Sequence, residues 1–99
     1  MHRLTVLYRP PLDPEHFRDY YVNTHLPLAV KLPGLVRSDY SLDVAGFGDD
    51  NPYFAVFHGD FESAQAMSAA LASAAGKAVA GDVPNYATGG VEMIHYPLA

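Results

Sequence analysis

Cysteine is absent from this chain of 99 residues. A disulfide, a thiol nucleophile and a thiolate metal site are therefore excluded. The sequence also lacks the histidine and carboxylate spacings of common metal sites, the glycine-rich loops that cradle nucleotides, and the GxSxG turn of serine hydrolases. We therefore expect no metal and no cofactor, so any chemistry has to come from a few polar side chains in an apolar pocket.

Positive charge is scarce as well. Six lysines and arginines stand against eleven aspartates and glutamates, which gives a formal net charge of -5. This balance argues against a nucleic-acid partner, because phosphate binding requires a basic patch. No apolar run approaches the roughly 20 residues that span a bilayer, and the first residues are too interrupted for a signal sequence. We expect a cytoplasmic protein of one domain, residues 1–99, with no membrane partner.

Apolar residues make up 49% of the chain, and their spacing predicts four strands and two helices. Alternation predicts strands over residues 3–8, 36–44, 53–61 and 91–96, with a loop at 46–52. Asp13 is the expected cap of the first helix, and the second is expected over residues 62–75, capped by Asp60 or Ser63 and ended or weakened by Gly76. The order β-α-β-β-α-β predicts an α+β, ferredoxin-like split βαβ fold: a four-stranded antiparallel sheet with two helices on one face.

The third predicted strand differs from the others because both of its faces are apolar. Phe54 and Val56 alternate there with Tyr53, Ala55 and Phe57. Leaving such side chains exposed costs about 1.5–3 kcal/mol each. We therefore expect a homodimer in which a second subunit packs against the bare sheet face. A loop that covers this face is the alternative.

The segment YYVNTHLPL, residues 20–28, places a titratable ring where the first helix should break. Pro27 has no N–H and leaves the carbonyl of Asn23 without its helical partner. His25 lies at the edge of the apolar stripe, beside this gap. An imidazole in such a small polar pocket suits a general base or acid acting on a phenol or an enol. The alternative is a structural histidine that caps the helix end and bonds a loose carbonyl.

Together with the predicted fold, this segment resembles the EthD family over nearly the whole chain. The matching features are Tyr8, Asp13, Phe17, Tyr20-Tyr21, His25-Leu26-Pro27-Leu28, Pro33-Gly34, Phe61 and the alanine-rich second helix. The resemblance implies a dimeric α+β barrel, in which two sheets form a barrel across the dimer and a pocket lies between sheet and helices. That superfamily includes cofactor-free quinone-forming monooxygenases, lactone isomerases, polyketide cyclases and haem enzymes. The family takes its name from an ether-degradation gene cluster with an oxygenase.

Four further residues are candidate substrate contacts. Tyr20 and Tyr21 border the stripe about 100° apart, where a phenol can bond a substrate carbonyl or stabilise an enolate, although packing alone also explains them. His58 faces the pocket of His25 only if its side of the strand meets the helices; otherwise it is structural. Tyr86, just before the last strand, is a candidate lid or substrate contact, with packing as the alternative.

The remaining candidates carry weaker signals. His95 has the same ambiguity of face as His58, and His2 and His16 are expected at the surface. Asp19 lies on the far side of the first helix, which argues against a pair between Asp19 and His25.

Two kinds of function fit these observations. The first is a cofactor-independent enzyme, ranked as an oxidoreductase of the monooxygenase type, that binds a small hydrophobic or aromatic compound and uses His25 for proton transfer. An isomerase, cyclase or decarboxylase would need the same first step. The second is a non-catalytic protein that binds such a compound or assists an oxygenase.

Overall fold

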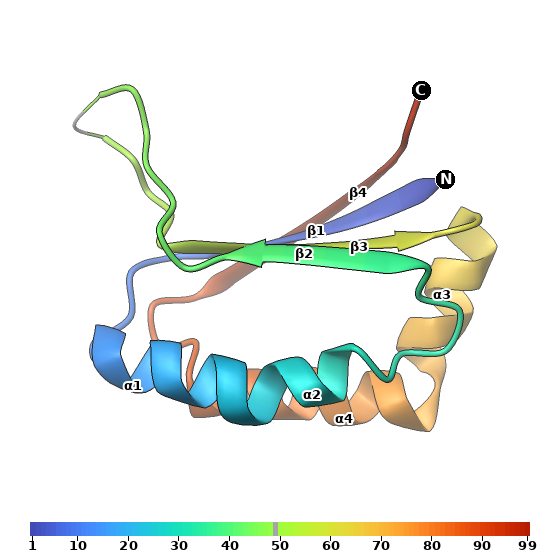
Figure 1. Cartoon of the computed structure of the whole chain (residues 1–99), viewed down its shortest axis with the longest axis horizontal. Helices are drawn as coiled ribbons and strands as arrows, with labels where there is room; N and C mark the ends of the chain where they lie inside the picture. The colour runs from blue at the N-terminus through green and yellow to red at the C-terminus, as the bar shows by residue number, and fades with distance from the viewer. Residues whose placement is uncertain (49) are drawn as a thin grey trace.

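A computed structural model of the chain describes residues 1–48 and 50–99. Its sheet contains β1 (His2–Tyr8), β2 (Arg37–Ser41), β3 (Ala55–Phe61) and β4 (Val91–Pro97), in the spatial order β2-β3-β1-β4. All neighbouring strands are antiparallel. The helices lie against one face of the sheet, and the opposite face is left open (Figure 1). The predicted α+β ferredoxin-like fold is confirmed.

The helical layer is divided into more pieces than the sequence predicts. The first arm consists of α1 (Pro14–Tyr20), a π-helical turn η1 (Tyr21–His25) and α2 (Leu26–Ala29), and the second consists of α3 (Ala64–Ala72), α4 (Ala74–Asp82) and the 3-10 turn η2 (Val83–Asn85). The predicted cap is present: Asp13 Oδ1 accepts a hydrogen bond from the His16 amide at 3.1 Å. Within the described residues, no helix has the length and apolarity needed to cross a membrane.

The expected helix break at Pro27 does not occur. Figure 1 shows α1, η1 and α2 as one continuous arm. The Leu26 amide donates to the Tyr21 carbonyl, five residues back, so the helix widens by one residue before the proline. Pro27 then occupies the first turn of α2, where its missing N–H is tolerated. The wide turn absorbs the proline and keeps the arm helical.

The second arm bends at Ser73, three residues before the predicted end at Gly76. Ser73 is extended, and its hydroxyl accepts a hydrogen bond from the Gly76 amide at 3.1 Å, which caps α4. Ser63 caps α3 in the same way through Ala66. Gly76 is buried inside α4, where a Cβ atom would lie 2.4 Å from the carbonyl oxygens of Ala70 and Leu71. This glycine permits close contact between the two helices.

Replacing Gly76 with alanine is expected to destabilise the fold by about 2–3 kcal/mol, because two backbone carbonyls would have to move. Gly81, also in α4, provides a matched control, since a Cβ atom there meets nothing within 4 Å. Gly81→Ala should stabilise the protein slightly by favouring the helix. Urea denaturation of the two variants measures the contrast, and equal midpoints would show that the α3–α4 contact is not tight.

β2 and β3 are shorter than predicted, while β1 and β4 each extend one residue further, and β3 is not apolar on both faces. Phe54 lies outside β3 and packs against Phe17 on the helix side, with ring centroids 5.0 Å apart. The open face of β3 carries Val56, His58 and Asp60, because these residues alternate with the buried Ala55 and Phe57. The expectation of a bare apolar strand was therefore wrong. The loop predicted at 46–52 is observed at its described residues, while Asp49 lies outside them.

An ion-pair cluster organises part of this open face. Asp60 is 1% exposed and accepts hydrogen bonds from Arg3 at 2.8 and 3.0 Å and from Arg37 at 2.6 Å. The bond from Arg3, together with that from Arg37, outweighs burial and lowers the pKa of the Asp60 carboxyl to about 2. The cluster joins three neighbouring strands, since β3 pairs with both β1 and β2.

Candidate functional site

A cavity of about 120 Å³ lies between the sheet and the helices. Its walls come from the helix-facing side of β1, β3 and β4 and from the helical segments η1, α2, α3, α4 and η2. They consist of Leu4, Val6, Tyr8, Tyr21, His25, Ala29, Leu32, Phe57, Leu71, Gly76, Val79, Ala80, Val83, Val91 and Met93. Val91 and Met93 on the edge strand β4 are 38% and 55% exposed, so the cavity reaches the surface beside them. The lining is apolar apart from one imidazole and two phenols.

The hydroxyl of Tyr21 is the unusual group in this lining. Tyr21 is 1% exposed, and its Oη has no hydrogen-bond partner among the described residues. Tyr8 lies beside it, with ring centroids 5.7 Å apart, and its nearby hydroxyl adds to the effect of burial in raising the pKa of Tyr21, but the hydrogen bond of the Tyr8 hydroxyl is made to Tyr86, at 2.7 Å. A buried hydroxyl without a partner costs about 1–3 kcal/mol, so this position favours a ligand oxygen.

His25 lines the same cavity from the end of the π-helical turn. The residue is 3% exposed, and its Nδ1 lies 2.9 Å from Asp82 Oδ2 at the end of α4. With Asp82 ionised, Nδ1 carries the proton and Nε2 is the basic nitrogen of the neutral ring. None of the described residues hydrogen-bonds Nε2. The imidazole is therefore held by a carboxylate on one nitrogen, and its other nitrogen is available to a ligand.

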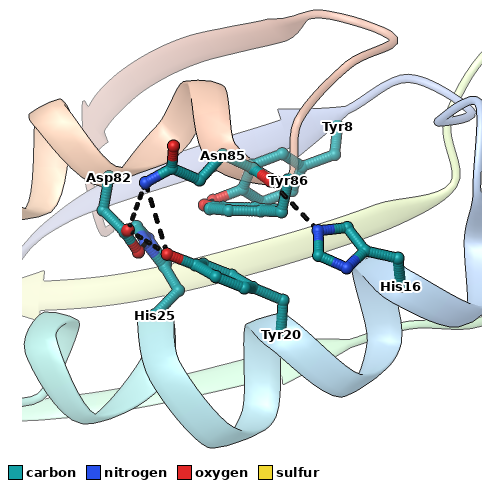
Figure 2. A network of polar contacts seen from close by, with 7 residues as sticks. All are labelled: Tyr8, His16, Tyr20, His25, Asp82, Asn85 and Tyr86. Atoms are coloured by element: carbon teal, nitrogen blue, oxygen red, sulfur yellow. Dashed lines mark hydrogen bonds and ion pairs between the residues drawn. The ribbon is translucent and has the colours of Figure 1, made fainter.

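A polar network outside the cavity holds Asp82 in place (Figure 2). Asp82 Oδ1 accepts hydrogen bonds from the Tyr20 hydroxyl at 2.6 Å and from the Asn85 amide at 3.0 Å. The carbonyl of Asn85 lies 3.1 Å from His16 Nε2. These bonds connect the first helical arm to the end of the second. The orientation of His25 thus depends on both arms.

The protonation states follow from burial and from this network. Burial lowers the pKa of His25, and the nearby Asp82 carboxylate reverses part of that effect. Burial raises the pKa of Asp82, but the bonds from Tyr20, Asn85 and His25 outweigh it and leave a pKa below the usual value. Burial also raises the pKa of Tyr21 far above its ordinary value. At neutral pH the site therefore combines a neutral imidazole, a carboxylate and a protonated phenol.

The structure separates the residues that the sequence groups together. Tyr21 and His25 line the cavity. The Tyr20 hydroxyl is bound to Asp82 outside it, and Tyr86 is 1% exposed with its hydroxyl bonded to Tyr8, so neither side chain forms a lid. His58 lies on the open face of the sheet, opposite the cavity. Of the two alternatives left open for His58, the structure therefore selects the face away from His25, and His58 is not a substrate contact in this cavity.

The other histidines differ partly from expectation. His2 is 9% exposed rather than at the surface, because its Nε2 lies 2.8 Å from Nδ1 of His95 on the neighbouring strand. His95 lies on the same sheet face as Leu4, which points toward the helices. His16 is exposed as predicted. Within residues 1–48 and 50–99, no cluster of three or more histidines and carboxylates is arranged to hold a metal ion.

Three parts of the site were not predicted from the sequence: Asp82, Asn85 and Tyr8. Asp82 carries a signal only once α4 is known to end there, because an acidic residue in the last turn of a helix opposes the helix dipole and requires another partner, whereas the second helix was expected over residues 62–75. Asn85 had no comparable signal. Tyr8 was placed correctly on its strand face, but the pairing of its hydroxyl depends on a residue 78 positions away.

Removing the Tyr21 hydroxyl is expected to leave the free protein as stable as before or slightly more stable, because the group has no partner. Tyr86→Phe is the matched control. It removes a buried hydrogen bond and should cost about 1 kcal/mol, which lowers the Tm by about 4–8 °C in a domain of this size. Thermal unfolding followed by circular dichroism measures both changes. If Tyr21→Phe lost as much stability as Tyr86→Phe, the Tyr21 hydroxyl would have to form a hydrogen bond in the free protein.

The fold and the cavity define a class of protein: a small ferredoxin-like α+β domain with a buried histidine–aspartate pair beside an apolar cavity. The EthD domain model matches residues 9–90. The chain also is 35% identical over 96 residues to an uncharacterized 11.0 kDa protein in the thcB–thcC intergenic region of Rhodococcus erythropolis, covering 95% of this chain and 91% of that protein. This chain belongs to the EthD domain family.

Solved structures support the same fold. An ethyl tert-butyl ether D (EthD) family protein from Bacillus halodurans superposes with a TM-score of 0.92 at 24% identity, covering 100% of this chain and 99% of that one. A dimeric ferredoxin-like protein from Thermobifida fusca superposes with a TM-score of 0.75 at 13% identity, covering 98% and 90%. At these identities the likeness concerns the fold.

Proposed function

We propose that this protein is a cofactor-independent enzyme that moves a proton on a small apolar or aromatic compound, with His25 as the catalytic base. The observation that carries this proposal is the buried His25–Asp82 pair at the wall of an otherwise apolar cavity. A neutral imidazole, positioned by a carboxylate and shielded from water, is suited to accept a proton from an acidic O–H or C–H group. Tyr21 adds a hydrogen-bond donor for the oxygen on which negative charge develops.

The first step in this mechanism is the transfer of a proton from a phenol or an enolisable carbon to His25 Nε2. Asp82 accepts the hydrogen bond from Nδ1 and stabilises the imidazolium. For a phenol, the resulting anion can give electrons to dioxygen and form a carbon–oxygen bond to it; cleavage of the O–O bond then leaves one oxygen on the ring as a quinone carbonyl and releases the other as water, which takes the ring hydrogen and the proton returned by His25. A phenol and dioxygen thus give a quinone and water with the substrate as the reductant, which makes the protein an oxidoreductase of the monooxygenase type. We rank this outcome first because the matching domain is EthD and a structural relative is described as an ethyl tert-butyl ether D family protein. Return of the proton to another atom would instead give an isomerase, and ring closure or loss of carbon dioxide a cyclase or a decarboxylase.

The proposal can be tested without knowing the natural substrate. Cyclohexenone is incubated with the protein in D₂O, and uptake of deuterium is followed by NMR as a measure of proton abstraction alone. Phenol is incubated in air, and oxygen consumption together with benzoquinone absorbance reports oxygenation, because this conversion adds one oxygen atom to the ring. Faster exchange than in buffer supports the proton-transfer step. Binding of these compounds with no exchange and no oxidation would instead favour a non-catalytic protein that holds a small molecule for another enzyme.

We also propose that the protein acts as a homodimer that pairs the open faces of two sheets. Ile94 is 50% exposed and lies on this face, beside Thr5. Ferredoxin-like structures from Thermobifida fusca and from Jannaschia are described as dimeric. Ile94→Asp should therefore yield a monomer in analytical ultracentrifugation. Val30→Asp, at a similarly exposed position that caps the C-terminus of α2, should stay dimeric. A native protein that sediments as a monomer at micromolar concentration would exclude the dimer.

A further inference from the structure

The size of the cavity limits the compounds that the proposed enzyme can accept. Its volume is about 120 Å³. An apolar protein cavity of about 150 Å³ is known to bind benzene, so the space here suits one six-membered ring. A fused pair of rings would have to displace wall residues such as Phe57, which is 4% exposed in the core. The opening beside Val91 and Met93 leaves room for a short substituent only at that end.

The charge of the cavity wall further limits the compounds that can bind. Among the residues that the structure describes, no lysine, arginine, aspartate or glutamate lines the cavity, and His25 is neutral at neutral pH because burial lowers its pKa. A carboxylate inside this wall would lose its hydration without gaining a cationic partner. A neutral compound carries no such penalty. The wall therefore favours neutral ligands over anions of the same size.

The polar groups define where the ligand oxygen binds. Tyr21 and His25 lie on the same turn of the first helical arm, with ring centroids 5.4 Å apart. The Tyr21 hydroxyl is buried and unpaired among the described residues, and its raised pKa keeps the proton in place. It therefore offers a donor, while Nε2 of His25 offers an acceptor. A phenol or enol hydroxyl has the matching acceptor and donor on a single oxygen.

We propose that the site is specific for neutral, single-ring phenols or cyclic enols whose oxygen lies between Tyr21 and His25. This inference rests on the proposed function in one respect, since it takes the cavity to be the substrate site. It goes further by excluding carboxylates and fused two-ring compounds, and by assigning to Tyr21 the recognition of the hydroxyl group.

Binding measurements separate this inference from the proposed function because they require no turnover. The probes are p-cresol, toluene, benzoate and 1-naphthol, titrated by calorimetry or ligand-observed NMR. We expect p-cresol to bind at least tenfold more tightly than toluene, which lacks only the hydroxyl, and at least tenfold more tightly than benzoate and 1-naphthol. In Tyr21→Phe the preference for p-cresol over toluene should fall to about threefold or less.

The matched control is Tyr53→Phe, because the Tyr53 hydroxyl bonds Glu92 away from the cavity. This variant should keep the full preference for p-cresol. Equal binding of 1-naphthol or benzoate, or an unchanged preference in Tyr21→Phe, would overturn the inference. If the probes bind as expected but no deuterium exchange occurs, the specificity stands and the catalytic proposal fails.

Discussion

Replacing His25 with glutamine is expected to lower the rate of proton transfer by about 10²-fold or more. Glutamine can still donate a hydrogen bond to Asp82, but it offers no basic nitrogen to the cavity. The measurement is the deuterium exchange rate of a compound that the native protein labels. Circular dichroism and the Tm should show that the variant keeps its fold.

His58→Gln provides the control for this substitution. His58 is a histidine of the same chain, on the sheet face opposite the cavity. Its replacement should leave the exchange rate within about twofold of the native value. If His25→Gln retains full exchange, His25 is structural and another group is the base. If both variants lose exchange equally, the loss reflects a general perturbation rather than the removal of a base.

Replacing Asp82 with asparagine is expected to reduce proton transfer by roughly 10²-fold or more, although Asp82 does not line the cavity. The asparagine amide can donate to Nδ1 of His25, which would leave the proton of the neutral ring on Nε2 and remove the base from the cavity side. Asp82 is thus a positioning residue. Asp43→Asn removes the same charge at an exposed carboxylate paired with Arg18 and should have little effect.

The pH dependence of the proton-transfer rate shows whether Asp82 positions His25 or only stabilises the fold. The active form of His25 is neutral, and its pKa is lowered, so the native rate should fall only as the pH drops below the ordinary histidine value of about 6.5. In Asp82→Ala the carboxylate no longer raises the pKa of His25, so the acid limb of the rate profile should move to still lower pH. An Asp82→Ala variant with an unchanged acid limb would show that the carboxylate does not interact with the catalytic ring.

The overall fold could be predicted from the sequence because alternation and caps are local signals. Residues 2–8 and 91–97 form strands close to those predicted, and Asp13 caps the helix as expected. The helix boundaries were harder to predict. Gly76 appears in the sequence as a helix terminator, but its role depends on contact with Ala70 and Leu71 of the preceding helix.

The candidate site could be predicted only in part, for a similar reason. His25 and Tyr21 are four residues apart on one helical arm, so their common face follows from local geometry. Asp82 lies 57 positions from His25, and only tertiary structure brings the two side chains together. The face of His58 could not be deduced either, because alternation gives two sides of a strand without saying which one meets the helices.

The wide turn at Tyr21–His25 has a consequence for comparing relatives of this chain. A π-helical turn contains one residue more than the α-helix around it, so it is equivalent to a single inserted residue. A relative with an uninterrupted α-helix would have one residue fewer between its tyrosine and its histidine. An ungapped alignment would then pair His25 with the wrong neighbour, and the histidine would look unconserved in a family that retains it. Placing a one-residue gap in this turn restores the correspondence.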